Sequence, residues 1–294
     1  AHLSADMVLA NRVVTGGVPI LVVSLLIGLR YEVGVDYPIY KEIYEFSTFA
    51  DIGKSMEESG VEPLFTLICS LLHKCDIPYY GMFFMMTVIP FCFFYSAFRQ
   101  MQHLFIPAVL LLYMTGTLFW YLNIMRQGVS FFIILYAIQY IRSRSFLKYL
   151  FWIVIAAGFH VSAFIFIPLY LLAYVRRPLM GRWIALVVYL FTWIYSKPLL
   201  SSSFHLFTPL LEGRYAKYAN VLETWEMGGG TGLGVLILHI IDLTLIYFSP
   251  KCVRFFREER FDIYYNLFFI GALLANIAGL NMLLSRVPFC LISM

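Results

Sequence analysis

The stretch RSRSFLKYLFWIVIAAGFHVSAFIFIPLYLLAYVRRPLMGR (142–182) decides how this chain is laid out. Its apolar centre, 149–175, has a basic stretch at each end, RSRSFLK (142–148) and RRPLMGR (176–182). Short basic loops of membrane proteins lie in the cytoplasm, so both ends of the centre are predicted on the same side. We therefore expect 149–175 to be a helical hairpin that turns at Gly158-Phe159-His160. A single tilted span over the same residues is the alternative.

The composition is that of a polytopic membrane protein. Of the 294 residues, 61% are hydrophobic and only 13% are charged, against about 25% charged residues in soluble domains. A helix needs about 20 apolar residues to cross a bilayer. The candidate spans are 7–28, 80–98, 104–122, 124–141, 183–200, 233–249 and 263–282, with another beginning near 286. We expect an all-α membrane protein with a single transmembrane domain over 1–294, in a chain that is truncated at both ends.

The basic loops also fix the expected orientation of the longer segments. KCVRFFREER (251–260) is basic and is predicted to be cytoplasmic, like the two stretches already quoted. The segments 29–79 and 201–230 are then external. Within the first of them, 60–74 forms a shorter amphipathic run.

Basic residues on the external side need another explanation, because the positive-inside rule does not place them there. Four arginines fall where hydrophobic segments reach that face: Arg30, Arg126, Arg214 and Arg286. The planar guanidinium binds phosphate oxygens in a bidentate manner, so a converging set predicts a site for a phosphate or pyrophosphate headgroup. The alternative is that each arginine reaches separately to lipid phosphate.

The external segments carry further candidate side chains. GLRYEVGVDYPIYKEIYE (28–45) places Asp36, Tyr37 and Tyr40 near Arg30, where Asp36 could orient that arginine or accept a proton. An interfacial loop with tyrosines at headgroup depth is the alternative. Glu62 begins the amphipathic run, where an acidic residue is ordinarily a helix cap.

Two candidates lie within the apolar segments, one at the start of a span and one at a turn. Arg126 and Gln127 open the helix predicted over 124–141, where free N–H groups favour an anion. His160, at the turn of the predicted hairpin, could donate to a phosphate or act as an acid or base. An interfacial arginine and a structural histidine are the respective alternatives. His239 and Asp242 share a helix face within 233–249, which favours an interhelical hydrogen-bonded pair over a proton relay.

Other kinds of site have no sequence signal. The five cysteines show no metal-ligand or disulfide spacing, and no nucleotide-binding, serine-hydrolase or zinc-protease motif is present. We expect no metal, no cofactor and no nucleic-acid partner.

Taken in order, several segments resemble the EpsG family of bacterial exopolysaccharide proteins, which is similar to the Wzy-type O-antigen polymerases. The residues that carry the resemblance are GLRYEVGVDYPIYKEIY, EPLF, MRQGVSFFIILYAIQYI, FWIVIAAGFHVSAFIFIPLYLL, RYAKY and the final SRV. They run from about residue 20 to the end, and their order is more specific than any one of them.

The resemblance implies a GT-C-like membrane glycosyltransferase with an outward-facing cavity, in the bacterial cytoplasmic membrane. Such an enzyme polymerises oligosaccharide units carried on undecaprenyl diphosphate, with a flippase and a chain-length regulator as partners. The marked positions carried onto this chain are Arg30, Asp36, Tyr37, Tyr40, Glu62, Arg126, Gln127, His160, Arg214, Tyr215 and Arg286. Asp36, Glu62 and His160 are the candidate general bases, Arg126 is a candidate catalytic residue, and the others would bind the diphosphate and substrate. An O-antigen-ligase type of transfer and a flippase are the alternatives.

Overall fold

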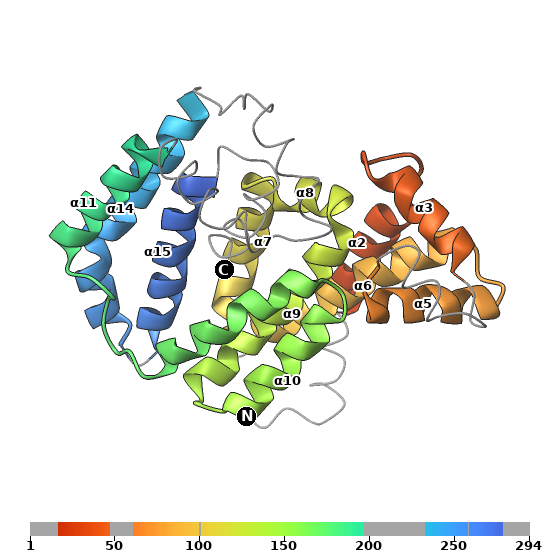
Figure 1. Ribbon diagram of the computed structural model, residues 1–294, viewed down its shortest axis with the longest axis horizontal. Helices are drawn as coiled ribbons and strands as arrows, with labels where there is room; N and C mark the ends of the chain where they lie inside the picture. Colours follow the sequence, from red (N-terminus) through yellow and green to blue (C-terminus); the bar gives the residue numbers. More distant parts are fainter. Residues whose placement is uncertain (1–16, 48–60, 100, 197–232, 258, 279–294) are drawn as a thin grey trace, which may run out of the picture. The chain divides into compact units, whose positions relative to one another are not determined.

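A computed structural model describes residues 17–47, 61–99, 101–196, 233–257 and 259–278 (Figure 1). All regular secondary structure in these ranges is helical. The chain divides into two compact units, Ala1–Tyr170 and Leu171–Met294. The predicted external segment 201–230, the span near 286 and the candidates Arg214, Tyr215 and Arg286 lie outside the described residues.

Helix α9 is the centre of the first unit. It spans Met125–Arg142, as the apolar pattern over 124–141 predicts, and packs against α6 and α10 (Figure 1). Most of its side chains are buried, so it lies inside the protein rather than against lipid. The elements of this unit are α2 (Val18–Gly28), α3 (Tyr37–Phe46), α5 (Pro63–Lys74), α6 (Tyr79–Ala97), η3 (Gln102–Leu104), α7 (Phe105–Met114), α8 (Thr117–Asn123), α9, α10 (Phe146–Ala157) and the 3-10 helix η4 (Val161–Ala173), whose last residues belong to the second unit.

The segment predicted as a hairpin does fold back on itself. Helix α10 ends at Ala157 and η4 begins at Val161. The Tyr149 hydroxyl donates to the Phe166 carbonyl over 2.7 Å, and the rings of Phe146 and Tyr170 lie 5.0 Å apart. These contacts join residues on either side of the turn, so a single continuous helix is excluded. The return of both ends to one side of the membrane stays a prediction.

The span predicted over 104–122 is not straight. The η3–α7 helix, Gln102–Met114, and α8 meet at 61°. The bend occurs at Gly116, whose φ of +74° is a conformation that favours glycine. The Thr115 hydroxyl lies 2.7 Å from both the Leu111 carbonyl and the Thr117 hydroxyl, so polar groups at the break are satisfied. This pair is either a broken span or a re-entrant element.

The second unit contains α11 (Arg182–Ile194), α14 (Leu233–Phe255) and α15 (Phe261–Ala278) around a core that includes Tyr189 and Phe269. Helix α14 runs past the predicted end at 249 and through Pro250. Proline leaves the carbonyl one turn earlier without its helical partner. The Ser249 hydroxyl donates to that carbonyl, of Ile246, over 2.8 Å, which allows the helix to continue.

Two described helices, α6 and residues Val235–Phe255 of α14, are long and apolar enough to cross a membrane, and the bent α7–α8 pair is a third if it counts as one span. This is the architecture of a polytopic membrane protein.

Inside the second unit, the Tyr189 hydroxyl lies 2.7 Å from both His239 Nδ1 and Asp242 Oδ2. The Tyr189 hydroxyl of α11 thus links His239 and Asp242 of α14 by hydrogen bonds between two helices, as the interhelical interpretation predicts.

Candidate active site at Glu62

Three predicted site residues from distant parts of the chain meet at the carboxylate of Glu62. Arg126 Nη1 donates to Glu62 Oε2 in a short ion pair. His160 Nδ1 lies 2.8 Å from Oε1, and the backbone N–H of Val161 donates to the same oxygen over 3.4 Å. Each oxygen of this carboxylate therefore has a partner from a different helical element.

The backbone around Glu62 turns its carboxylate toward these partners. Glu62 is the N-cap residue of α5, with extended backbone angles and Pro63 at the first helical position, and its side chain does not cap the helix. The N–H of Leu64 donates to the Gly158 carbonyl over 2.8 Å. This bond fastens the start of α5 to the turn that carries His160. The alternative interpretation of Glu62, a side chain that caps the helix, is wrong, because that side chain bonds to other elements instead.

The electrostatic setting of Glu62 keeps it ionised. The Glu62 side chain is 12% exposed, whereas those of Arg126 and His160 are 25% and 28% exposed. Burial raises the pKa of Glu62, but the hydrogen bond from His160 and the charge of Arg126 outweigh it and hold the pKa below its usual value. An ionised carboxylate only accepts hydrogen bonds, so His160 Nδ1 carries the proton. Nε2 is then the ring nitrogen left for a ligand.

Arg126 keeps donor capacity beyond its ion pair. It opens α9 and lies over the ring of Phe65, 5.9 Å from its centroid. Its Nε is buried without a hydrogen-bond partner among the described residues. Tyr40 is close by: burial raises the pKa of Tyr40, and the charge of Arg126 opposes that rise. An arginine at a helix start with an unmatched donor suits an anionic ligand.

Arg30 lies behind this cluster rather than in it. Its buried guanidinium donates from Nη2 to the Leu122 carbonyl over 2.8 Å and to Met125 Sδ over 3.3 Å, and it lies over the Phe83 ring at 5.0 Å. The Leu122 carbonyl is at the end of α8, where carbonyls lack helical partners. Arg30 therefore fixes the junction from which Arg126 projects.

The comparisons with known proteins agree with the sequence pattern. The model of the EpsG family matches residues 13–294. The chain belongs to the EpsG family. No curated protein and no solved structure matches it. Family membership and the apolar helices together indicate a bacterial membrane protein with an exopolysaccharide-related function.

Of the other candidates in this EpsG-family chain, Tyr37 and Tyr40 lie in α3 and Gln127 lies in α9. Tyr37 is buried and stacks on Phe83 with 4.6 Å between centroids, and Tyr40 donates to the Asn123 carbonyl over 3.4 Å. Gln127 is buried in the first turn of α9. Asp36 precedes α3, is half-buried, and forms no ion pair within the described ranges.

Asn123 is a site residue that the sequence reasoning missed. Its Oδ1 accepts from the N–H of Val35 over 2.7 Å, which ties the segment after α2 to the start of α9. Gly34 makes the approach feasible, since its φ is +110° and a Cβ would lie 3.0 Å from the Leu122 carbonyl. The signal was a polar residue directly before the helix in WYLNIMRQ.

In the part of the chain that the structure describes, no group of three His, Cys, Asp or Glu side chains could hold a metal ion.

Proposed function

We propose that this protein is a polymerase that joins undecaprenyl-diphosphate-linked oligosaccharide units at the outer face of the cytoplasmic membrane. The observation that carries the proposal is the arrangement of His160 and Arg126 on the two oxygens of Glu62. A histidine oriented by a carboxylate is suited to proton transfer. An arginine beside it is suited to a leaving group that gains negative charge. Family membership supports the same class of reaction.

His160 is the best placed of the three candidate bases. With Nδ1 bonded to Glu62, Nε2 is free to accept the proton of a sugar hydroxyl on the acceptor unit. Arg126 and His160 already bond to the Glu62 carboxylate, so Glu62 acts as a positioning residue that stabilises the protonated imidazole of His160. Asp36 has no described contact with His160, which leaves it outside this step.

The reaction then balances as one displacement. The acceptor oxygen gives its proton to His160 Nε2 and forms a glycosidic bond to the anomeric carbon of the donor chain. The bond from that carbon to the diphosphate oxygen breaks, and undecaprenyl diphosphate leaves with the electron pair. Arg126 stabilises the charge that develops on the diphosphate. Arg30 serves as a positioning residue for Arg126, and Arg214 and Arg286 stay predicted diphosphate ligands.

A defined substrate tests the proposal. Purified protein in nanodiscs receives one lipid-linked repeat unit, and the products are separated by length. We expect longer lipid-linked chains, and a rate that falls by roughly 10²–10⁴-fold in His160→Gln. His103→Gln is the matched control, since His103 is an exposed histidine of η3. Transfer to a different lipid or protein acceptor would instead identify a ligase. Unchanged substrate that crosses a vesicle membrane would identify a flippase.

A further inference from the structure

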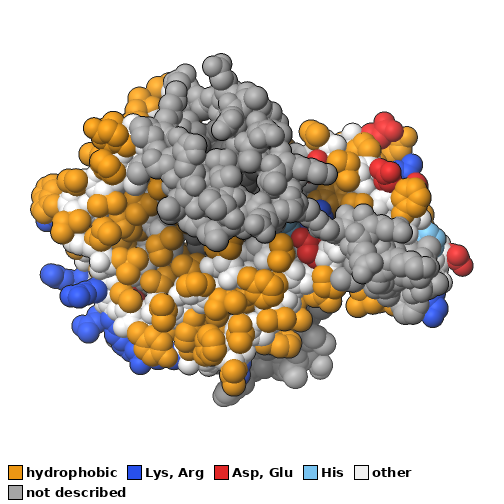
Figure 2. Space-filling model, in the orientation of Figure 1, with side chains coloured by type: hydrophobic (Ala, Val, Ile, Leu, Met, Phe, Trp, Pro, Cys, Tyr) orange, Lys and Arg blue, Asp and Glu red, His pale blue; other side chains and the backbone are white. Residues whose placement is uncertain are grey.

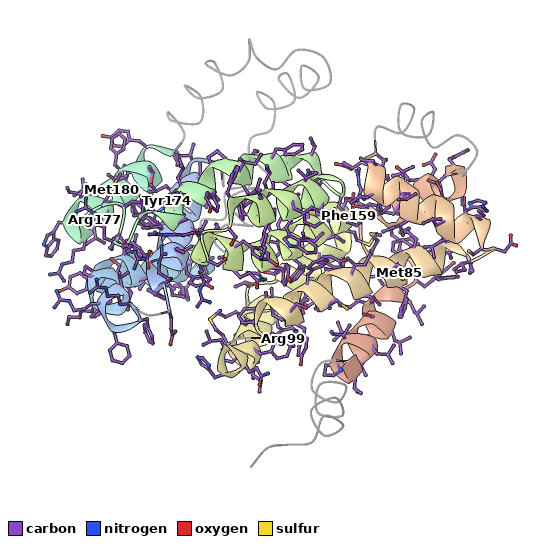
Figure 3. All side chains as sticks on the ribbon, turned by 90° about the horizontal axis from the view of Figure 1, so that it is seen from below. Met85, Arg99, Phe159, Tyr174, Arg177 and Met180 are labelled. Atoms are coloured by element: carbon purple, nitrogen blue, oxygen red, sulfur yellow. The ribbon has the colours of Figure 1, made fainter. Side chains whose placement is uncertain are left out.

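The second unit contains a basic hollow that the proposed reaction does not use. It lies on the loop between η4 and α11, has a volume of about 450 Å³, and is lined by Tyr174, Val175, Arg176, Arg177, Pro178 and Leu179. Figure 3 shows Tyr174, Arg177 and Met180 on this loop. Both arginines are exposed, and neither forms an ion pair with any residue in the described ranges. Their guanidiniums are therefore available to a ligand.

Buried polar side chains hold the loop backbone in place. Asn266, which is fully buried, accepts from the N–H of Leu179 over 2.9 Å and donates to the Arg177 carbonyl over 3.0 Å. Arg260 Nη2 donates to the Val175 carbonyl over 3.1 Å, and Asp262 fixes that guanidinium at 3.0 Å. These bonds satisfy the backbone groups of Val175, Arg177 and Leu179 in the loop that lines the hollow.

The charge around the hollow is strongly positive. Figure 2 shows Lys and Arg side chains gathered at the lower left, where α14 ends and α11 begins. The basic residues of this end of the unit that are exposed or half-buried, apart from the paired Arg260, are Arg176, Arg177, Arg182, Lys251, Arg254 and Arg257. Among the described residues of this end, Glu259 is an exposed acidic residue that they outnumber. An anionic ligand complements such a surface.

An exposed apolar surface adjoins the basic end. Trp183, Ile184 and Val187 of α11 are 65%, 62% and 66% exposed, as expected of side chains that face acyl chains. The Arg182 guanidinium lies 5.2 Å from the ring centroids of both Trp183 and Tyr247. Aromatic rings under a cationic group are typical of headgroup depth. The hollow therefore lies where a headgroup and its acyl chains could both be accommodated.

We propose that Arg176 and Arg177 form a site for the phosphate of an anionic phospholipid, whose acyl chains lie along the exposed face of α11. Guanidiniums suit phosphate oxygens, and fixed basic pockets on the cytoplasmic side of membrane proteins attract anionic headgroups. The lipid would fasten this end of the second unit to the membrane. This lipid site does not depend on the polymerase reaction.

The test is native mass spectrometry of the detergent-purified full chain, titrated with phosphatidylglycerol or phosphatidylcholine of the same acyl chains. We expect preferential binding of phosphatidylglycerol, reduced roughly tenfold in Arg176→Gln/Arg177→Gln. Arg144→Gln/Lys148→Gln removes the same charge from the basic stretch 142–148 and should leave the preference unchanged. Thermal unfolding confirms that each variant is folded.

Three outcomes would overturn the proposal. The first is equal binding of the two lipids by the unaltered protein. The second is an equal loss in both double variants, which would show general surface charge. The third is displacement of phosphatidylglycerol by inorganic phosphate at the same concentration, which would show a site for a free anion rather than a lipid.

Discussion

His160 and Glu62 are 98 residues apart in the chain, yet His160 Nδ1 lies 2.8 Å from the Glu62 carboxylate. The contact forms because α5 begins against the turn between α10 and η4, through the bond from Leu64 N–H to the Gly158 carbonyl. Arg126, in the first turn of α9, forms an ion pair with the same carboxylate. The first unit thus gathers a potential base, its orienting acid and a cation from three separate elements.

The depressed pKa of Glu62 predicts an acid-sensitive contribution to stability. A carboxyl whose pKa is lowered by folding stabilises the protein above its ordinary value of 4.5, and this contribution is lost as the pH falls through the folded pKa. At neutral pH, Glu62→Gln should therefore unfold at a lower temperature than the unaltered protein. The gap should close as the pH falls below 4.5 and through the lowered pKa of the folded protein. Thermal unfolding in detergent across this range is the measurement, and a gap that stays constant would contradict the ion pair.

Arg126→Lys should remove most activity without unfolding the protein. Lysine keeps the charge but cannot pair with Glu62 and a diphosphate oxygen through one planar group. We expect chain extension to fall roughly a hundredfold, as when a single transition-state donor is lost. Arg99→Lys, at an exposed arginine after α6, is the control. A normal extension rate in Arg126→Lys would make Arg126 an interfacial anchor.

Tyr189→Phe should destabilise the second unit. The hydroxyl of Tyr189 bridges His239 and Asp242, so its removal leaves two polar groups without that partner in an apolar setting. The expected loss is about 1–3 kcal/mol of unfolding free energy. Tyr247→Phe, at an exposed tyrosine of α14, should change stability little. Equal thermal shifts in the two variants would show that the bridge contributes nothing.

The predicted orientation can be checked by cysteine labelling. In a background without native cysteines, Ser145→Cys in the loop 142–148 should react with an impermeant reagent only after membrane permeabilisation. Glu42→Cys, on the exposed face of α3 in the segment 29–79, should react in intact spheroplasts. Labelling of position 145 in intact spheroplasts would reverse the topology.

The sequence located the candidate residues better than it described their contacts. Glu62 and Arg126 are recognisable because they are charged residues at the start of apolar or amphipathic runs, and His160 because it is a titratable group at an interruption of one. Their meeting depends on how α5, α9 and α10 pack, which local pattern does not encode. Packing also explains the outcome for Arg30. The sequence predicts that Arg30 is a phosphate ligand, whereas its guanidinium is buried against the end of α8.

The predicted bounds of two helices were wrong, near Gly116 and near Pro250. The bend at Gly116 is invisible to a hydropathy window, because the residues on both sides are apolar. The continuation of α14 through Pro250 depends on the Ser249 hydroxyl, which satisfies the carbonyl that proline leaves free. The position of the hairpin turn, by contrast, was predicted correctly, because Gly158-Phe159-His160 interrupts the apolar stretch 149–175.

A double-mutant cycle tests most directly whether Glu62 and His160 act as one catalytic unit. Extension rates on one defined lipid-linked repeat unit are measured for the unaltered protein, Glu62→Gln, His160→Gln and the double variant. Residues that act through one proton transfer have non-additive effects, so the double variant should be about as slow as His160→Gln alone. Glu42→Gln with His103→Gln should leave the rate near normal. Independent, multiplying losses from Glu62→Gln and His160→Gln would contradict the account.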